Sequence, residues 1–439
     1  MFRKDVLSVA IPIIGEQTFV MLLGVVNTMM AGHIGAEAVS AIGMVDSINN
    51  MFIAFFAALS VGATVVVSQY IGKCDNNKAN ETIKQGLVSG ILISLIITIL
   101  MWFFREVLIN SFYGSATELV KTNAKIYIEV TLLTYPFVAI QQIASGVLRG
   151  CGDTKKPMLI SMIMNVVNIV FGYLLIYSAS LGIIGAAVSI AIARVTGSIV
   201  ILLILFKGSD IIKIRKVFPF MINVEIQKNI FSIGIPAGIE QVLFNAGKLI
   251  VQIFIVTMGT ASIASNTIGM SVSSIINVIG NALMLAATAL VGQYIGRGDV
   301  DGAKSTLIYL TKFATGCLVL LGFIFIPLAP WISSLYTDSS EVINISSQLI
   351  RSNSIAMIIW PMSFVLSSGL KGAGDTKYTM VTAIIGMWIF RICTGYLLGV
   401  VLGIGVLGIW IGMYTDWLIR GILYTSRLRG DKWVEHSIV

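Results

Sequence analysis

Residues 148–154 read Leu-Arg-Gly-Cys-Gly-Asp-Thr, and residues 370–376 read Leu-Lys-Gly-Ala-Gly-Asp-Thr. The second copy follows the first by 222 positions. Three other segments recur in the same order at offsets of 223 or 224 positions: Ile-Pro-x-x-x-Glu-Gln at 11–17 and 235–241, Gln-Tyr-Ile-Gly-(Lys/Arg)-x-Asp at 69–75 and 293–299, and Gly-Tyr-Leu-Leu at 172–175 and 395–398. Four ordered matches at a nearly constant offset indicate that the chain is an internal duplication.

The composition places this duplicated chain in a membrane. Of its 439 residues, 56% are apolar and only 11% are charged, whereas soluble domains carry about 25% charged residues. The apolar residues would fill about a dozen spans of roughly 20 residues each. This composition excludes a soluble enzyme, a secreted disulfide scaffold and a disordered chain. The four cysteines are scattered and follow no metal-ligand spacing, so neither a disulfide nor a metal site is expected.

Twelve apolar stretches are bounded by charged residues, Gly, Pro, Asn or Asp. Their centres lie near residues 18, 55, 94, 134, 167, 193, 243, 278, 319, 356, 390 and 413. Continuous stretches of this length do not alternate as barrel strands do, so helices are expected. The predicted fold is an all-α polytopic membrane protein with 12 transmembrane helices in two six-helix lobes. Because six is an even number, both lobes enter from the same side, and a pseudo-twofold axis runs along the membrane normal.

The distribution of Lys and Arg predicts the orientation. Twenty cations follow even numbers of crossings: Arg3, Lys4, Lys73, Lys78, Lys84, Arg149, Lys155, Lys156, Lys207, Lys213, Arg215, Lys216, Lys228, Arg297, Lys304, Lys371, Lys377, Arg427, Arg429 and Lys432. The opposite loops hold only Arg105, Lys121, Lys125 and Arg351. The positive-inside rule therefore puts both termini in the cytoplasm. The lobes are predicted at residues 1–206 and 229–439, joined by a cytoplasmic linker at 207–228.

Several of these motifs resemble those of the MATE family, the multidrug and toxic compound extrusion antiporters. They are the two Leu-(Arg/Lys)-Gly-x-Gly-Asp-Thr loops, Val-Gly-Gln-Tyr-Ile-Gly at 291–296 and Val-Asn-Thr-Met-Met-Ala-Gly at 26–32. The resemblance implies twelve spans in two lobes and export of amphipathic, often cationic compounds in exchange for protons or sodium ions. The chain carries no nucleotide-binding signature, so an ion gradient is expected to drive transport.

Two carboxylates stand inside predicted spans at equivalent repeat positions, Glu16 in the first span and Glu240 in the seventh. A carboxylate in a membrane must be protonated, paired or bound to an ion. Two interpretations stay open: a hydrogen-bonded Glu near the cytoplasmic end of its helix, or a protonatable residue that couples ion movement to transport. Each Glu lies about 11 residues, roughly 16 Å, from the start of its helix, which is compatible with mid-membrane depth.

The acids that the family usually places in the first lobe are replaced in this chain. The resemblance implies one acid at Asn27 and another at Gly172, four residues after Asn168. The amides can coordinate an ion through oxygen, but they carry no negative charge. The replacements favour a shift of coupling to Glu16 and Glu240, and the predicted ion-coupling set is therefore Glu16, Glu240, Asn27 and Asn168.

The second lobe also departs from the family pattern. The resemblance maps an acid of span 10 to Trp360 and an acid of span 7 to Phe244 or Asn245. Span 7 instead carries a polar stripe that includes Lys248, which is expected to face the cleft and either to pair with Glu240 or to repel cationic substrates. The predicted substrate-cleft residues are Gln141, Asn165, Gln241, Asn245, Lys248, Gln252 and Asn277. Arg194, Arg391 and Asp416 are expected to form pairs between helices within a lobe.

The sequence thus predicts a secondary active antiporter for multidrug efflux that works by rocker-type alternating access. The alternative is a lipid-linked saccharide flippase of the same superfamily fold, although its pyrophosphate cargo calls for a strongly cationic cavity. The sequence contains no HExxH motif, no GxSxG motif and no paired acidic motif within a span, so nothing in it indicates an enzyme. We expect small organic substrates and membrane lipid as partners, no nucleic acid, no cofactor beyond the coupling H⁺ or Na⁺, a monomer, and a location in the inner (plasma) membrane.

Overall fold

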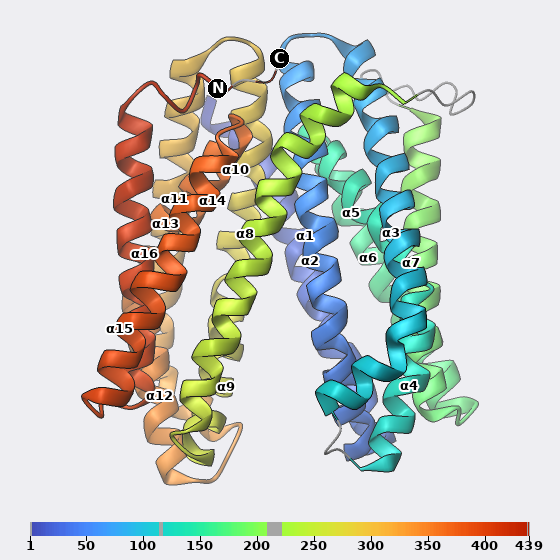
Figure 1. Ribbon diagram of the computed structural model, residues 1–439, viewed down its shortest axis with the longest axis vertical. Coiled ribbons are helices and arrows are strands. Elements are labelled where there is room, and N and C mark those ends of the chain that lie inside the picture. Colours follow the sequence, from blue (N-terminus) through green and yellow to red (C-terminus); the bar gives the residue numbers. More distant parts are fainter. Residues whose placement is uncertain (1, 114–116, 209–221, 437, 439) are drawn as a thin grey trace. The chain divides into compact units, whose positions relative to one another are not determined.

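The computed structural model describes residues 2–113, 117–208, 222–436 and 438, and all regular structure in these ranges is helical (Figure 1). The first half contains α1 (Phe2–Ile34), α2 (Ala36–Gly72), α3 (Asn76–Tyr113), α4 (Glu118–Leu132), α5 (Tyr135–Gly150), α6 (Lys155–Gly172), η1 (Tyr173–Ser178) and α7 (Gly182–Lys207). The second half contains α8 (Val224–Val256), α9 (Thr260–Ile276), α10 (Val278–Gly296), α11 (Val300–Ser334), α12 (Ser340–Ala356), α13 (Trp360–Gly372), α14 (Thr376–Ile385), η2 (Gly386–Arg391), α15 (Ile392–Tyr396), η3 (Leu397–Val401) and α16 (Val406–Arg429).

The described helices confirm the predicted all-α membrane fold. Ten of them are long and apolar enough to cross a membrane, and the number rises to 12 if each of two bent pairs counts as one span. The bent pairs are α4 with α5, at 51°, and α12 with α13, at 53°. Pro136 and Pro361 stand in the first turns of α5 and α13. Proline has no N–H to extend the preceding helix, and its fixed φ suits the start of a new one, so each span bends at this point.

The chain separates into two compact units, which we call the N-unit (Ile11–Ile235) and the C-unit (Met1–Ala10 with Pro236–Val439). Both divisions fall next to a proline inside a long helix, Pro12 in α1 and Pro236 in α8. α7 ends at Lys207 and α8 begins at Val224. Most of the predicted linker at 207–228, residues 209–221, lies outside the described residues, so its bounds stay a prediction.

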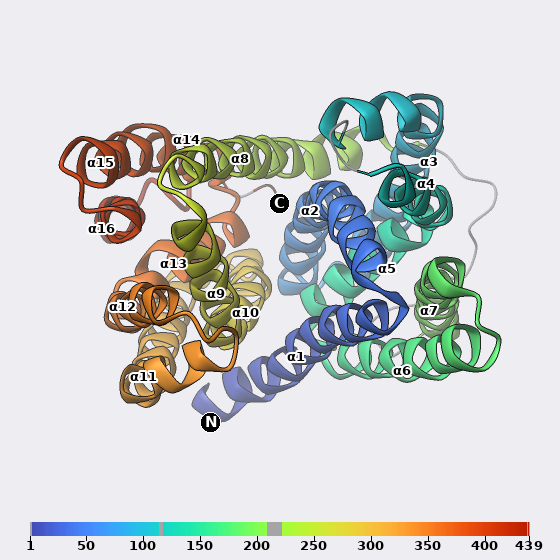
Figure 2. The ribbon, with the colours of Figure 1, turned by 90° about the horizontal axis from the view of Figure 1, so that it is seen from below.

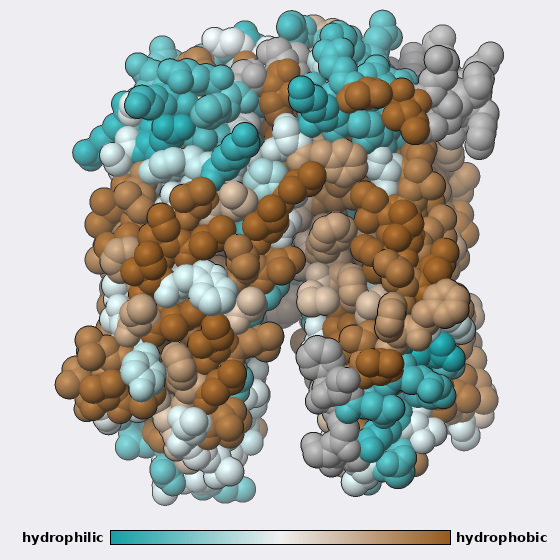
Figure 3. All heavy atoms as spheres, viewed as in Figure 1, coloured by the Kyte–Doolittle hydropathy of each residue, from teal (hydrophilic) through white to brown (hydrophobic). Residues whose placement is uncertain are grey.

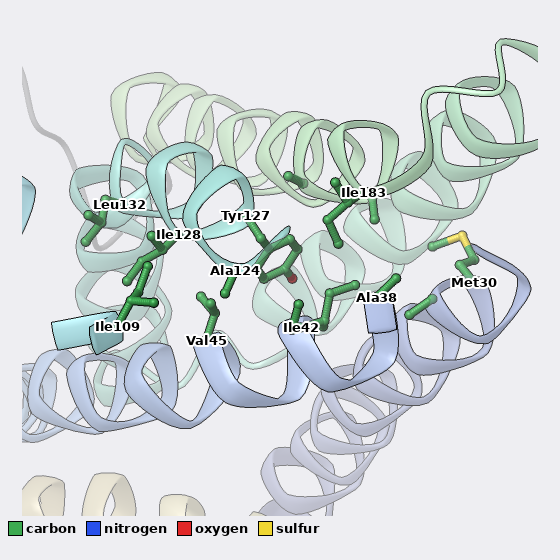
Figure 4. Close-up of a cluster of buried hydrophobic side chains, with 14 of the residues drawn as sticks. Met30, Ala38, Ile42, Val45, Ile109, Ala124, Tyr127, Ile128, Leu132 and Ile183 are labelled. Atoms are coloured by element: carbon green, nitrogen blue, oxygen red, sulfur yellow. The ribbon is translucent and has the colours of Figure 1, made fainter. Parts of the chain in front are cut away.

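The N-unit is built around α2, which packs against α3, α4 and α5, while α6 packs along α7. Figure 2 shows α6 and α7 side by side. Buried apolar side chains from α1, α2, α3, α4 and α7 converge in one cluster (Figure 4). Tyr127 and Ile128 of α4 lie in it against Ile42 and Val45 of α2. This cluster fixes the bent α4–α5 span against α2.

The C-unit repeats this packing in its own helices. α10 packs against α11 and α13, α9 packs against α12, and α16 packs against α13, α15 and η2. Close approaches recur at matched positions as well. A Cβ added to Gly185 would lie against the backbone of Leu175, and one added to Gly408 would lie against the backbone of Leu398. Gly408 follows Gly185 by 223 positions, and Leu398 follows Leu175 by the same number. The duplication seen in the sequence is therefore a duplication of packing.

The repeated loop motifs close their helices in the same way. After α5 and α13, the residues with positive φ are Gly152 (88°) and Gly374 (100°). The N–H of Asp153 then bonds to the carbonyl of Leu148, and that of Asp375 bonds to the carbonyl of Leu370. This is the Schellman pattern, in which a left-handed residue lets the chain turn back on the last turn of a helix. The glycines of the motif thus serve the turn.

Apolar side chains cover the middle of both units on the face shown in Figure 3, and hydrophilic side chains gather over the ends of the helices. Exposed large hydrophobic residues are frequent on the outer helices: Phe103 and Phe104 of α3 are 75% and 56% exposed. Exposed apolar surface of this extent suits a hydrocarbon environment.

Candidate functional site

A buried ion pair joins the first and fifth helices of the N-unit. Arg149 Nη1 donates to Glu16 Oε1 at 2.6 Å, and both side chains are buried. Glu16 comes from the middle of α1, and Arg149 is the last residue but one of α5. The second carboxylate oxygen, Glu16 Oε2, is buried and has no hydrogen-bond partner among the described residues.

The C-unit contains the equivalent pair. Lys371 Nζ donates to Glu240 Oε1 at 2.8 Å, and these side chains are 16% and 12% exposed. Glu240 lies in α8, and Lys371 is the last residue but one of α13. Glu240 Oε2 also has no hydrogen-bond partner among the residues that the structure describes. Both halves therefore hold a carboxylate with one oxygen on a cation and the other unpartnered.

These pairs change one expectation from the sequence. Arg149 and Lys371 are expected in loops, but both lie within helices and contact an acid. Because each is next to the last residue of its helix, the two carboxylates lie within reach of the C-terminal ends of α5 and α13. The signal for the pairing was present, since Glu and a basic residue recur together at offsets of 224 and 222 positions.

Asn27 and Asn168, two of the predicted coupling residues, are in direct contact. Asn168 Nδ2 donates to Asn27 Oδ1 at 2.7 Å, which links α6 to α1. Asn168 is fully buried, and its Oδ1 has no hydrogen-bond partner within the described part of the chain. The two amides thus form a small neutral site in the N-unit.

The space beside Gly172 is filled by another side chain. A Cβ on Gly172 would overlap Met30 Sδ and would lie 2.7 Å from Met30 Cε. An acidic side chain therefore has no room there unless Met30 moves. The acid that the resemblance implies at this position is replaced by apolar packing from α1.

The other predicted cleft residues of the N-unit tie helices together. Asn165 Nδ2 donates to the carbonyl oxygen of Phe19 at 2.8 Å and so joins α6 to α1. Gln141 of α5 places its Nε2 2.9 Å from Met164 Sδ of α6. Asn165 is buried and Gln141 is half-buried. These contacts link α6 to α1 and to α5.

The polar stripe of α8 has mixed surroundings. Gln252 Oε1 accepts from Asn266 of α9 at 3.3 Å, while Gln241 and Asn245 are half-buried. The sequence allows Lys248 to pair with Glu240, but in the structure the ion-pair partner of Glu240 is Lys371. Instead, Lys248 Nζ lies over the Phe244 ring, 5.1 Å from its centroid.

Asn277, at the junction of α9 and α10, donates to Ser273 Oγ at 3.3 Å. Its Oδ1 is buried and has no hydrogen-bond partner in the described ranges. Trp360, the position where the resemblance implies an acid, is buried and stacks on Phe364 with ring centroids 4.6 Å apart. Its ring lies over Gly280, so this position also serves packing.

Of the three charged residues expected to pair between helices within a lobe, Arg391 and Asp416 form an ion pair with each other, whereas Arg194 bonds to a hydroxyl group. Arg391 Nη2 of η2 lies 2.9 Å from Asp416 Oδ2 of α16. In the N-unit, Arg194 Nη1 of α7 donates to Thr134 Oγ1 at 2.8 Å. Arg420, which is not among the residues predicted from the sequence, lies 3.8 Å from the same Asp416 oxygen. The signal was its spacing, because an acid and a base four residues apart share one face of a helix.

The sequence profile of the MatE family matches residues 12–174 and 236–397, once in each half of the chain. The chain belongs to the MatE family. The two matched segments contain both carboxylates and both of their basic partners. Both ion pairs thus lie within the parts of the chain that the family profile matches.

Similar proteins share this family over their whole length. A probable multidrug resistance protein NorM of Thermotoga maritima is 27% identical over 443 residues, covering all of this chain and 94% of that protein. An uncharacterized transporter YisQ of Bacillus subtilis is 28% identical over 436 residues, covering 98% and 95%. A structure described as the outward-facing conformation of a multidrug resistance MATE family transporter matches with a TM-score of 0.91 at 22% identity, covering 98% and 95%. This MatE chain is therefore a multi-span helical protein of a transporter family, and the comparisons do not favour the flippase alternative.

Proposed function

We propose that this MatE protein is a secondary active antiporter that exports amphipathic organic compounds, cations such as ethidium among them, in exchange for H⁺ or Na⁺. We place the protein as a monomer in the inner (plasma) membrane. Both termini are proposed to be cytoplasmic, because the positive-inside rule assigns the loops with the twenty Lys and Arg residues to that side. We propose no cofactor, and small organic molecules and lipid as partners. The name of the NorM relative supports multidrug export.

The observation that carries ion coupling is the pair of equivalent buried carboxylates. Glu16 and Glu240 each hold one oxygen against a cation and leave the other without a partner among the described residues. A proton or Na⁺ arriving at Oε2 would compete with Arg149 or Lys371 for the negative charge. Ion arrival and pair opening would then be linked, which provides the two-state element that an antiporter needs.

Rocker-type motion is proposed from the division of the chain. α1 and α8 each pass from one compact unit to the other beside an internal proline, Pro12 or Pro236. A proline inside a helix removes one backbone hydrogen bond and is a common point of bending. Six predicted spans in each repeat also suit two similar bodies that move as units.

The experiment is ethidium efflux from proteoliposomes under separately imposed proton and sodium gradients. Efflux that follows one gradient identifies the coupling ion, and no efflux under either gradient would contradict the antiporter. Glu16→Gln and Glu240→Gln are expected to abolish drug-driven proton release per amount of protein reconstituted, if the ion is H⁺. Glu118→Gln is the matched control, because Glu118 is an exposed acid paired to a nearby Lys.

The single Glu16 variant leaves the Arg149 charge buried without its partner, which could prevent folding. The double variant Glu16→Gln/Arg149→Gln removes both charges together and so avoids that cost. It should reconstitute and still lack drug-driven proton release. Normal release in this double variant and in Glu240→Gln would overturn the assignment of coupling to these acids.

A further inference from the structure

Three cations of the C-unit surround one aromatic ring. Around the Phe244 ring centroid, Lys248 Nζ lies at 5.1 Å, Arg391 Cζ at 5.1 Å and Arg420 Cζ at 5.7 Å. They come from α8, η2 and α16, so α8 meets two elements from much later in the chain. A cation is attracted to the negative face of an aromatic ring, but the ring carries no net charge to balance three cations.

The acids nearby do not balance them either. Asp416 pairs with Arg391 and lies within 3.8 Å of Arg420, while Glu240 is held by Lys371. Counting Lys371, Arg391 and Arg420 against Asp416 and Glu240 leaves one buried positive charge in excess, and the exposed Lys248 adds a second beside them. Buried excess charge is costly unless a counter-charge is supplied.

The repeat shows that this cluster belongs to one half of the chain. At the offsets of 223 or 224 positions that relate the helices, the four charged positions of α8, η2 and α16 correspond to uncharged residues of the N-unit. These are Gly24 for Lys248, Asn168 for Arg391, Ala193 for Asp416 and Gly197 for Arg420. The shared fold therefore does not require the cluster.

Several hydrogen-bond donors of the two arginines are unused. Arg391 Nε, Arg420 Nε and Arg420 Nη1 are buried and have no hydrogen-bond partner among the described residues. The two Asp416 oxygens make no aligned hydrogen bond either, so this acid does not satisfy them. Guanidinium groups present donors in a fixed fork that matches a carboxylate or a phosphate. An oxyanion would satisfy both the excess charge and the unused donors.

The solvent exposure of the side chains decreases across the cluster. Lys248 is exposed, Phe244 is half-buried, and Arg391 and Arg420 are 6% and 2% exposed. Arg420 also lies over the Phe364 ring, with its Cζ 4.7 Å from the centroid. An anionic group that meets Lys248 first would thus find arginines behind it and aromatic surface beside it.

We propose that Lys248, Arg391 and Arg420 bind the carboxylate or phosphate group of an amphipathic molecule whose apolar part lies against Phe244 and Phe364. The inference rests on the proposed function only in taking this molecule to be a substrate. A zwitterionic amphipath fits both the expected cationic cargo and this site.

The test compares rhodamine B, which has a free carboxylate, with its ethyl ester, which keeps the same dye cation. Binding to the purified protein is measured by fluorescence anisotropy in a neutral maltoside detergent. Wild type should bind the free acid more tightly than the ester. Lys248→Gln should weaken binding of the acid about tenfold, the effect of losing one charged hydrogen bond, and leave the ester unchanged. Among the described residues Lys248 takes part in no ion pair, so this variant leaves none of their buried acids unpaired.

Lys248→Arg should retain the preference for the acid, and Lys312→Gln, an exposed Lys of α11, is the matched control. Equal affinity for acid and ester, or equal weakening of both by Lys248→Gln, would overturn the proposal. Nanodiscs of phosphatidylcholine with or without phosphatidylglycerol identify the source of the anion. Competition by phosphatidylglycerol in wild type but not in Lys248→Gln supports a lipid headgroup, and absence of competition supports a free substrate.

The outcomes also separate this site from the proposed function. Selective binding of the acid without gradient-driven efflux would keep the site and reject the antiporter. Gradient-driven efflux of the ester without selective binding of the acid would keep the antiporter and reject the site.

Discussion

Glu16 and Arg149, which are 133 positions apart in the chain, form a 2.6 Å ion pair in which the side chains are 5% and 8% exposed. The counterpart in the second half joins Glu240 to Lys371, which is 131 positions away. The duplication thus holds a long-range electrostatic contact in both halves, with Arg in one and Lys in the other. Arg can bind a carboxylate with two parallel N–H groups, but in each half only one carboxylate oxygen accepts a hydrogen bond from the cation.

Arg149→Gln should destabilise the protein by about 3–5 kcal/mol, because it leaves a buried Glu16 carboxylate without its cation. Thermal unfolding in detergent should show this as a lower Tm. Lys371→Gln should cost less, since the Glu240 pair is more exposed. In the double variant Glu16→Gln/Arg149→Gln, most of the loss should be recovered. Additive losses from the two single substitutions would show that the residues do not interact.

Cys74→Gly should stabilise the protein by about 1 kcal/mol, because Cys74 has φ 61° and its repeat partner is Gly298 at φ 75°. Both residues close a helix with the same hydrogen bonds, so the glycine should fit without rearrangement. The reverse substitution, Gly298→Cys, is the matched control and should lower stability by a similar amount. An unchanged or lower Tm in Cys74→Gly would show that the Cys side chain makes a compensating contact.

The sequence predicts the fold well because its signals are local or repeated. Apolar stretches mark the spans, and motifs at a constant offset mark the two halves. The bent spans were each located as one stretch, since the apolar pattern continues across the breaks before Tyr135 and Trp360. Side-chain partners were harder to predict. Arg149 looked like a loop cation because charge and position along the chain do not reveal which helix packs beside α1. The cations around Phe244 come from three separate elements, and only packing brings them together.

Asn27→Asp should be tolerated, whereas Gly172→Asp should not. An aspartate at position 27 still offers an oxygen to Asn168 Nδ2, which donates at 2.7 Å in the wild type. At position 172 the new side chain would overlap Met30. Fluorescence size-exclusion chromatography should show a monodisperse peak for Asn27→Asp and loss of it for Gly172→Asp. Met30→Ala should restore the peak of Gly172→Asp by making room, and failure of this rescue would mean that something other than Met30 excludes the acid.

Cys74 and Cys151 should differ in labelling by a maleimide, and the difference tests the orientation of the chain. Cys74 is exposed in the loop after α2, whereas Cys151 is buried after α5. Burial raises the pKa of the Cys151 thiol to about 12. The reactive thiolate is therefore scarce at neutral and mildly alkaline pH, and folded Cys151 should stay unlabelled. Because the folded state holds this proton more tightly, the stability contributed by Cys151 falls as pH rises from about 8.5 toward about 12.

The measurement uses a Cys317→Ala/Cys393→Ala background and a membrane-impermeant maleimide. If the basic loops face the cytoplasm, Cys74 should be labelled in inverted vesicles and protected in intact cells. Denaturation should then expose Cys151 as a second labelled site, because its pKa returns to about 8.5 in the unfolded chain. Labelling of Cys74 in intact cells would put the loops rich in Lys and Arg outside the cell. It would also place the Arg149 and Lys371 pairs at the outer ends of their helices, so that any coupling ion would reach Glu16 and Glu240 from the opposite side to the one proposed.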